Sequence, residues 1–392
     1  MTTGAERHRV AFLGTLYPGY VEQFYARRPE LGGLSFAEQE SKLADDFFGW
    51  GFSFPKALSD LGHETTYIIA NARPLQTRWA SENKRDYSES DWLMDLVIAR
   101  LQAFEPDTLY INDIFAFTPE RVSRIRRAVP SVKKLICYVG VGIEGKEIVP
   151  ECDMLVTCAP DLCDGLKKMG FHSAVQRHAF HSEILKSLEK NGRSGSRGEI
   201  EASFVGSLIP GFHKQRFETV HHLCRATPIQ VWTGSVERNW FSLMKRGVAA
   251  GFRGKLREFV YQDLNLPIRS RQRSELFGME MLETLWRSKV TVNCHVVSSG
   301  RDAGNIRMFE ATGVGACLLT DWRDHISDIF EPEKEVVTYR SPEEAAEKLL
   351  WLLENPKERQ AIAQAGQARV LREHTFERRA ADVNEWITEL HA

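Results

Sequence analysis

The segment 298–321, SSGRDAGNIRMFEATGVGACLLTD, holds the richest set of residues whose types and spacing could bind a charged ligand. Gly300 and Gly304 flank a turn, and a helix of about 305–312 is expected before the next strand. Amides and dipole at the start of such a helix favour an anion, and Arg307 adds a fixed charge suited to phosphate. We therefore predict a phosphate-bearing ligand here, although a glycine turn beside a solvated arginine is the simpler interpretation.

Two acids and an amide accompany this turn. Asp302 stands at the expected helix entry and Glu310 stands two turns into the helix, with seven residues between them. Asn305 would cap or open that helix. The loop thus combines fixed positive charge with side chains that accept hydrogen bonds from hydroxyl groups.

Length and composition bound the class of protein. The chain has 392 residues, 43% hydrophobic and 27% charged, which suits a large core divided between two domains. A net charge of −2 argues against a protein whose main business is coating nucleic acid or an anionic membrane, and leaves local charged patches open. The N-terminal MTTGAERHRVAF is charged where a signal peptide is apolar, so we expect a cytoplasmic protein, with peripheral contact to the inner face of a membrane left open. Cys152, Cys158 and Cys163 fit no common zinc template, and no metal site is expected.

Short apolar runs alternate with amphipathic stretches, the pattern of parallel sheets covered by helices. In the first half the predicted strands are 10–14, 65–70, 108–112, 134–140, 154–158 and 174–179, and the predicted helices lie near 36–61, 90–104, 118–128 and 160–169. In the second half the predicted strands are 202–207, 229–234, 290–294, 316–320 and 336–339.

These elements predict an α/β protein of two domains joined by a polar, glycine-rich linker. The expected segments are a first domain over 1–188, the linker over 189–202, a second domain over 203–375 and a terminal helix over 376–392 that packs back on the first domain. Ser341-Pro342 and Asn355-Pro356 each predict a helix start, and Thr375 is expected to cap the last helix.

The second half resembles a known family. NIRMFEATGVGACLLTD, followed by the capped helix pair and AGQARVLREHTFERR at 365–379, is similar to the C-terminal nucleotide-sugar domain of group-1 glycosyltransferases, in the bacterial branch with an N-x-R-x-F-E-A-T-G-x-G signature. The similarity is clear over 275–390 and weaker over 200–240. It implies the GT-B fold, in which two Rossmann-like domains face each other across a cleft, with the donor in the C-terminal domain and the acceptor in the N-terminal one.

The resemblance also implies roles for single residues. In the family's E-x7-E pair the second acid binds the ribose hydroxyls, a position held here by Glu310, and the first contacts the donor sugar. Asp302 occupies that first position, so the acid is shorter by one methylene.

Further donor-site candidates come from two matched segments. In FVGSLIPGFHKQR (204–216) the resemblance implies a diphosphate loop in which Gly206 and Ser207 form the turn, and Lys214 or Arg216 supplies the basic group. In FGMEMLETLWRSKVTVNCH (277–295) it places Gly278 near the nucleotide base and His295 at a strand end. A histidine at a strand end is more often structural than catalytic.

A metal-independent reaction is predicted because the chain contains no D-x-D sequence, the usual source of hard oxygen ligands for Mg²⁺ or Mn²⁺. Fixed cations and helix amides must then stabilise the leaving diphosphate, and no cofactor is expected. The stretch 245–273 carries eight Lys and Arg against Glu258 and Asp263. It could face the diphosphate, an anionic acceptor or a membrane surface, or be a solvated helix and loop.

Acceptor candidates lie in the first domain. After the first strand, GTLYPGY offers glycines for close backbone approach and flat rings suited to sugars, at Gly14, Tyr17, Gly19 and Tyr20. Asp113 and His178 follow later strands, and each could be a base or an acceptor contact. The alternative for all of them is an ordinary turn or packing role.

The sequence as a whole predicts a glycosyltransferase that moves a hexose-type sugar from a nucleotide-diphosphate sugar to a hydroxyl acceptor, with retention of configuration. The predicted catalytic residues are Asp302, Arg307, Asp113 and His178, the last two as bases only if configuration is inverted. Two alternatives stay open: a nucleotide-sugar epimerase on the same architecture, and a non-catalytic protein that binds sugar nucleotides.

Overall fold

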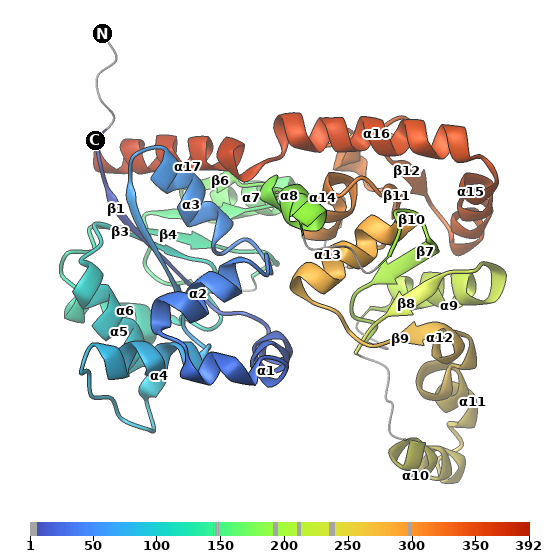
Figure 1. Cartoon of the computed structure of the whole chain (residues 1–392), viewed down its shortest axis with the longest axis horizontal. Coiled ribbons are helices and arrows are strands. Elements are labelled where there is room, and N and C mark those ends of the chain that lie inside the picture. The colour runs from blue at the N-terminus through green and yellow to red at the C-terminus, as the bar shows by residue number, and fades with distance from the viewer. Residues whose placement is uncertain are drawn as a thin grey trace. The chain divides into compact units, whose positions relative to one another are not determined.

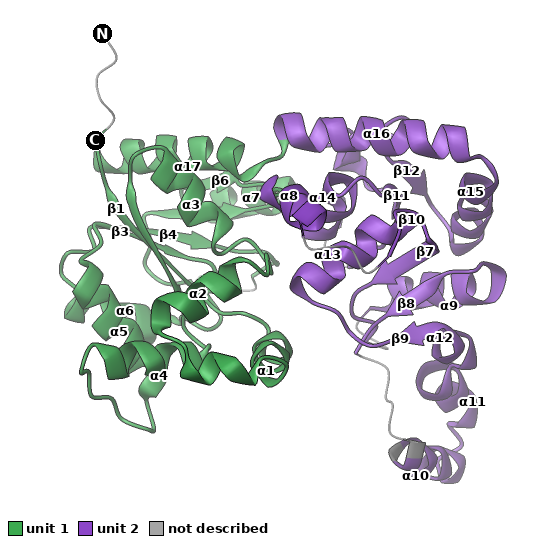
Figure 2. Cartoon of the chain, in the orientation of Figure 1, with its two compact units in different colours: residues 1–181, 374–392 green, residues 182–373 purple. Residues whose placement is uncertain are grey.

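The chain is described from a computed structural model. The description covers residues 6–392 except 144, 146, 148, 191–194, 210–212, 235–239 and 297–299. The chain divides into two compact units, unit 1 with residues 1–181 and 374–392, and unit 2 with residues 182–373 (Figure 2).

Unit 1 is built on a parallel sheet of six strands in the order β2-β1-β3-β4-β5-β6 (Figure 1). The strands are β1 (Arg9–Gly14), β2 (Glu64–Ile69), β3 (Thr108–Ile111), β4 (Lys134–Tyr138), β5 (Met154–Thr157) and β6 (Ser173–Val175). Their apolar side chains are almost wholly buried, as expected for parallel strands covered on both faces. The strand order reverses between β1 and β3, and this switch point is where open α/β sheets bind ligands.

The helices of unit 1 follow the strands. They are α1 (Pro18–Ala26), the 3₁₀ turn η1 (Pro29–Gly33), α2 (Phe36–Ala44), α3 (Ser53–Asp60), α4 (Arg73–Glu82), α5 (Trp92–Phe104), α6 (Pro119–Ala128), α7 (Pro160–Lys168) and α17 (Phe376–His391). The single helix expected near 36–61 is wrong. Phe47 and Gly49 take positive φ angles of 49° and 73°, which breaks the segment into α2 and α3.

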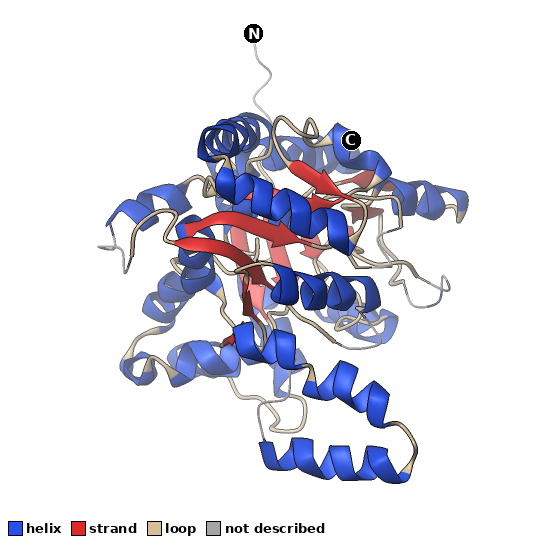
Figure 3. Cartoon of the chain, turned by 90° about the vertical axis from the view of Figure 1, so that its right-hand side faces the viewer, coloured by secondary structure: helices blue, strands red, loops and turns tan. Residues whose placement is uncertain are grey.

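Unit 2 has a second six-stranded parallel sheet, in the order β12-β11-β10-β7-β8-β9. The strands are β7 (Ile200–Val205), β8 (Gln230–Trp232), β9 (Gln272–Arg273), β10 (Ser288–Asn293), β11 (Cys317–Asp321) and β12 (Val337–Tyr339). Figure 3, coloured by secondary structure, shows the strands of the chain with helices beside them. The switch point lies between β7 and β10.

The helices of unit 2 complete this layer structure. They are α8 (Glu183–Lys190), α9 (Lys214–Ala226), α10 (Trp240–Phe252), α11 (Leu256–Phe259), the π-helical turn η3 (Val260–Leu264), α12 (Leu266–Arg271), α13 (Gly278–Arg287), α14 (Ile306–Gly313), the 3₁₀ turn η5 (Asp324–Asp328), α15 (Pro342–Glu354) and α16 (Pro356–Glu373). Ser341 caps α15, because its Oγ accepts a hydrogen bond from the Glu344 N–H at 3.2 Å.

The division between the units falls at 181/182, whereas the sequence placed a linker at 189–202. α8 occupies 183–190 and counts with unit 2, and β7 begins at Ile200, so the last residues of the expected linker are strand. Residues 191–194 of that segment lie outside the described residues. The division between the units lies before α8, because α8 packs on α13 and so belongs to unit 2.

The terminal helix α17 belongs to unit 1 and packs on α3. The rings of Phe376 and Phe54 meet edge to face at 6.0 Å, and His63 Nε2 lies 2.7 Å from Asn384 Oδ1. The C-terminal helix thus completes the core of unit 1, although it is far from the rest of that unit in the sequence. Among the described residues, no helix is both long and apolar enough to cross a membrane.

Candidate functional site

Arg216 joins the two strand ends that flank the switch point of unit 2. It lies in the first turn of α9, and its Nε and Nη2 donate to the Cys294 carbonyl oxygen at 3.0 and 2.7 Å. Its Nη1 donates to the Ser207 carbonyl oxygen at 3.2 Å. Because three of its five N–H groups hold backbone, two are left for a ligand. Burial lowers the pKa of this guanidinium from its ordinary value.

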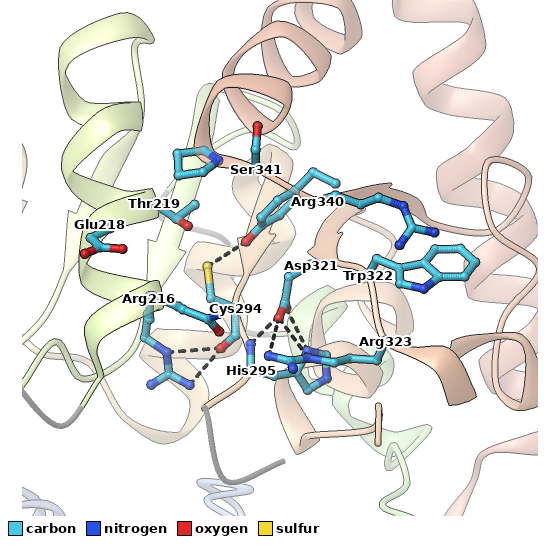
Figure 4. A pocket seen from close by; sticks show the side chains of 13 residues that line it. Arg216, Glu218, Thr219, Cys294, His295, Asp321, Trp322, Arg323, Arg340 and Ser341 are labelled. Carbon is cyan, nitrogen blue, oxygen red and sulfur yellow. Dashed lines mark hydrogen bonds and ion pairs between the residues drawn. The ribbon is translucent and has the colours of Figure 1, made fainter. Parts of the chain in front are cut away.

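A cavity of about 330 Å³ opens beside Arg216 at the carboxyl ends of β10, β11 and β12 (Figure 4). Three arginines line it, Arg216, Arg323 and Arg340, together with the two acids Glu218 and Asp321. The Arg340 guanidinium also lies 4.2 Å from the centre of the Trp322 ring, another lining residue. A cavity of this size suits a small-molecule ligand, and its cations suit phosphate.

One carboxylate, Asp321, organises the floor of this cavity. Its Oδ1 accepts from His295 Nδ1 at 2.7 Å and from the His295 backbone N–H at 2.9 Å. Its Oδ2 accepts from Arg323 Nε at 3.1 Å and Nη2 at 2.8 Å. Burial opposes ionisation, but the imidazole, its hydrogen bonds and the Arg323 guanidinium together lower the pKa of this carboxyl. Asp321 is therefore an ionised anchor.

His295 connects Asp321 to the loop before α14. The Gly304 N–H donates to His295 Nε2 at 3.3 Å, while Nδ1 of the same ring lies 2.7 Å from Asp321 Oδ1. Gly304 has a φ of 116°, a backbone conformation that favours glycine. His295 is buried, contacts this loop and is one of the residues that line the cavity.

The start of α14 keeps two buried polar atoms without a hydrogen-bond partner among the described residues, Asn305 Oδ1 and Arg307 Nε. Asn305 is the N-cap residue, but its side chain makes no cap hydrogen bond and its Nδ2 instead donates to Asn293 Oδ1 at 3.0 Å. Buried groups of this kind are rare in folded proteins and are candidates for binding a ligand.

Arg307 and Glu310 are paired one turn apart on α14. Arg307 Nη1 donates to Glu310 Oε2 at 2.6 Å, and both side chains are largely buried. Neither residue lines the 330 Å³ cavity. Asp302, the partner of Glu310 in the D-x7-E pair, is buried with its Oδ1 3.9 Å from His325 Nε2.

The other donor candidates of unit 2 are spread over three elements. The Gly206 N–H donates to the Trp232 carbonyl oxygen at 3.0 Å, continuing the ladder from β7 to β8. Gly278 begins α13 with a φ of 53°. Lys214 is exposed at the start of α9 and does not line the cavity, whereas Arg216 does.

Unit 1 places the acceptor candidates around β1 and β3. A Cβ atom on Gly14 would overlap the side-chain amide of Asn112. Asp113 is engaged in holding its loop, because its Oδ1 accepts from the backbone N–H of Phe115 at 3.1 Å and of Ala116 at 3.0 Å. The Thr15 hydroxyl donates to the other carboxylate oxygen.

The two tyrosines of GTLYPGY have different surroundings. Tyr17 is exposed, and its ring meets that of Phe48 edge to face at 5.7 Å. Tyr20 is buried and stacks on Phe48 at 3.9 Å, and burial together with Asp46 raises the pKa of its hydroxyl. Of the pair, only Tyr17 has an exposed ring.

The remaining candidates of unit 1 lie further from β1. Gly19 lies in the first turn of α1. His178 follows β6, with its Nε2 3.5 Å from the Tyr138 hydroxyl.

The sequence reasoning missed most of the residues that line the cavity, among them Cys294, Asp321, Arg323, Tyr339 and Arg340. The Cys294 thiol lies 2.7 Å from the Tyr339 hydroxyl, which donates to the Asn293 carbonyl oxygen at 2.9 Å. Burial raises the pKa of the Cys294 thiol to about 12, so it remains protonated. The signal was available: Asp321 and Arg323 directly follow the predicted strand 316–320, where parallel sheets bind ligands.

Comparison with known proteins fits this architecture. Residues 237–385 match the family model described as "Glycosyl transferase-like". A search of curated proteins finds no significant match.

Solved structures align over nearly the whole chain. A glycosyltransferase from Rickettsia africae aligns at 10% identity over 98% of this chain and 99% of its own, with a TM-score of 0.57. A sucrose-phosphate synthase from Thermosynechococcus elongatus gives 11% identity, coverage of 98% and 99% and a TM-score of 0.57. HepE from Anabaena, solved in complex with UDP-glucose, gives 12% identity, coverage of 98% and 100% and a TM-score of 0.55.

The two parallel six-stranded sheets with their helices are the GT-B fold. Residues 237–385, which lie mostly in unit 2, are similar to glycosyl transferase-like proteins, and the chain shares its fold with solved glycosyltransferases.

Proposed function

We propose that this protein transfers a sugar from a nucleotide-diphosphate sugar to a hydroxyl acceptor, with the donor bound in unit 2. The observation that carries the proposal is the set of three arginines, Arg216, Arg323 and Arg340, that line the cavity at the strand ends. Positive charge held in place before the reaction stabilises the diphosphate as it leaves. The complex of HepE with UDP-glucose supports a donor of this kind.

We place the ribose near α14. Asn305 Oδ1 is a buried acceptor without a partner among the described residues, and Glu310 lies one and a half turns further along the helix. The Arg307–Glu310 pair leaves the second carboxylate oxygen of Glu310 able to accept from a ribose hydroxyl. We expect Glu310→Gln and Arg307→Ala each to weaken nucleoside-diphosphate binding by about 1–3 kcal/mol in calorimetry. Unchanged affinity in both variants, with unchanged thermal unfolding, would remove α14 from the site.

The reaction proposed is metal-independent and retains the configuration of the sugar. The sequence lacks the paired carboxylates of a D-x-D motif, and arginines occupy the cavity. Asp113 is committed to its loop, which supports a mechanism in which the leaving phosphate accepts the proton of the acceptor hydroxyl. Activity that persists in EDTA and a product with the donor's anomeric configuration by NMR are the expected results.

The donor is identified by thermal shift with UDP, GDP, dTDP and CDP and then with their sugars, because a bound ligand stabilises the folded state by mass action. Donor turnover that requires a hydroxyl acceptor supports the proposal. A new nucleotide sugar formed without acceptor would indicate an epimerase. Saturable binding without turnover against glycan, lipid-linked, protein and small-molecule acceptors would indicate a non-catalytic binding protein.

A further inference from the structure

The connection from β8 to β9 carries a helical hairpin, formed by α10, α11 and η3 over residues 240–264 (Figure 1). Its inner side is packed. Leu243 and Phe259 are buried, and a Cβ atom on Gly247 would meet the Phe259 ring at 3.0 Å. Arg246 Nη2 lies 2.8 Å from Asp263 Oδ1 and joins the two arms. The two arms of the hairpin therefore pack on each other through one face of α10, which leaves the opposite face of α10 outside this packing.

The outside of α10 is apolar. Phe241, Met244, Val248 and Phe252 are exposed, and their spacing of three, four and four residues places them along one face of the helix. That face is about 16 Å long at the usual helical rise. Phe252 is 90% exposed and stands just before the turn, where Gly254 has a φ of 66°. A row of large apolar side chains on an exposed helix marks an interaction surface.

The second arm extends this apolar surface. Leu256 and Val260 are exposed and lie four residues apart, one turn along α11 and η3. Exposed apolar residues thus continue across the turn from one arm to the other. We refer to these six residues as the apolar edge of the hairpin.

Positive charge surrounds the apolar edge. The hairpin carries Lys245, Arg246, Arg253, Lys255 and Arg257 against two acids, Glu258 and Asp263. Both acids lie close to basic groups, Asp263 to Arg246 and Glu258 to Lys255 at 3.7 Å. Arg246, Arg253 and Lys255 line a hollow of about 230 Å³ between the arms. Glu258 and Asp263 line the hollow as well, which leaves it an excess of one positive charge.

We propose that this hairpin docks the protein on an anionic lipid bilayer. Apolar side chains on one face with Lys and Arg beside them form the pattern of a helix that lies in the membrane interface. The apolar edge would enter the boundary between headgroups and acyl chains, and the basic residues would contact lipid phosphates. A second copy of the chain fits less well, because two such hairpins meeting by symmetry would bring their positive charges together. The inference does not rest on the proposed sugar transfer.

Vesicle co-sedimentation of the full chain tests the proposal. We expect binding to vesicles of phosphatidylcholine with phosphatidylglycerol, weaker binding to phosphatidylcholine alone, and loss of binding as salt rises. Phe241→Ser with Phe252→Ser should reduce binding about tenfold, and Phe252→Trp alone should preserve it, because tryptophan suits the interface. Arg253→Gln with Lys255→Gln and Arg257→Gln should abolish the preference for the anionic vesicles.

Matched controls come from the exposed surface of α15 and α16. Trp351→Ser with Leu371→Ser removes two partly exposed apolar side chains, and Lys357→Gln with Arg372→Gln removes two charges. Both variants should bind vesicles as the unchanged protein does. Thermal unfolding confirms that each variant is folded. The proposal is overturned if folded hairpin variants bind like the controls, or if the unchanged protein binds neither vesicle. It is equally overturned if the apolar edge is needed only for self-association in sedimentation velocity.

Discussion

The guanidinium of Arg216 donates two hydrogen bonds to the carbonyl oxygen of Cys294, from Nε at 3.0 Å and from Nη2 at 2.7 Å. The two residues are 78 positions apart in the chain. This contact ties the start of α9 to the end of β10, across the point where the strand order of unit 2 reverses. A side chain that lines the cavity therefore also fixes its geometry.

Arg216→Lys should lower the free energy of unfolding by about 2 kcal/mol, because one ammonium cannot reproduce the planar set of N–H groups that holds the carbonyls of Cys294 and Ser207. Urea denaturation measures the change. Lys214→Gln, two residues away and exposed, should stay within about 0.5 kcal/mol of the unchanged protein. Equal losses in the two variants would show that charge at the start of α9, rather than the bridge, matters.

Arg323→Ala should destabilise unit 2 by about 2 kcal/mol, because it leaves the largely buried carboxylate of Asp321 without its charged partner, and urea denaturation measures the loss.

Asp321→Asn tests the same hydrogen-bond network through the pH dependence of stability. The folded state lowers the pKa of this carboxyl, so its contribution is present above about pH 4 and is lost as the pH falls below that value. The unchanged protein should lose stability more steeply than Asp321→Asn below about pH 4. Parallel curves would argue against the network.

His391 should make folding sensitive to mild acid. Burial and then the neighbouring His8 lower the pKa of its imidazole, while Asp107 acts in the opposite direction and Lys134 adds to the lowering. The folded state thus favours neutral His391, and stability present above about pH 6.5 should fall as the pH drops below it. Thermal unfolding across this range should show a smaller fall in His391→Gln than in the unchanged protein.

A matched control for this effect is His172→Gln, which changes an exposed histidine. It should leave the pH dependence as it is. His391→Gln can still hydrogen-bond the Thr108 hydroxyl, which lies 2.8 Å from His391 Nε2, so the helix keeps its anchor. The interpretation fails if the two variants follow the same curve.

Gly14→Ala should destabilise unit 1 by more than about 2 kcal/mol, because the new methyl group would overlap the Asn112 side chain at the end of β1. Gly14→Ala combined with Asn112→Ala should recover part of the loss, since the smaller residue makes room. A double-mutant cycle in urea measures the coupling. Additive losses would mean that the glycine is needed for another reason.

The sequence by itself determined the features that depend on near neighbours. Alternating apolar runs predicted two parallel α/β domains, because strand and helix periods are local properties. Ser341 caps α15 as predicted, since the capping hydrogen bond joins residues three apart. The helix expected at about 305–312 is α14, Ile306–Gly313, for the same reason.

Only the tertiary structure decided which side chains meet. Lys214 and Arg216 were equivalent in sequence, but the fold brings the Ser207 and Cys294 carbonyls to Arg216 alone. Packing also left the Tyr17 ring exposed and buried the Tyr20 ring, which stacks on Phe48. The contact between Arg216 and Cys294 joins residues far apart along the chain, and the type of a side chain does not indicate which distant residue it will contact. The basic stretch 245–273 shows the same division: its charge was visible in the sequence, but the apolar edge beside that charge depends on which face of α10 packs inward.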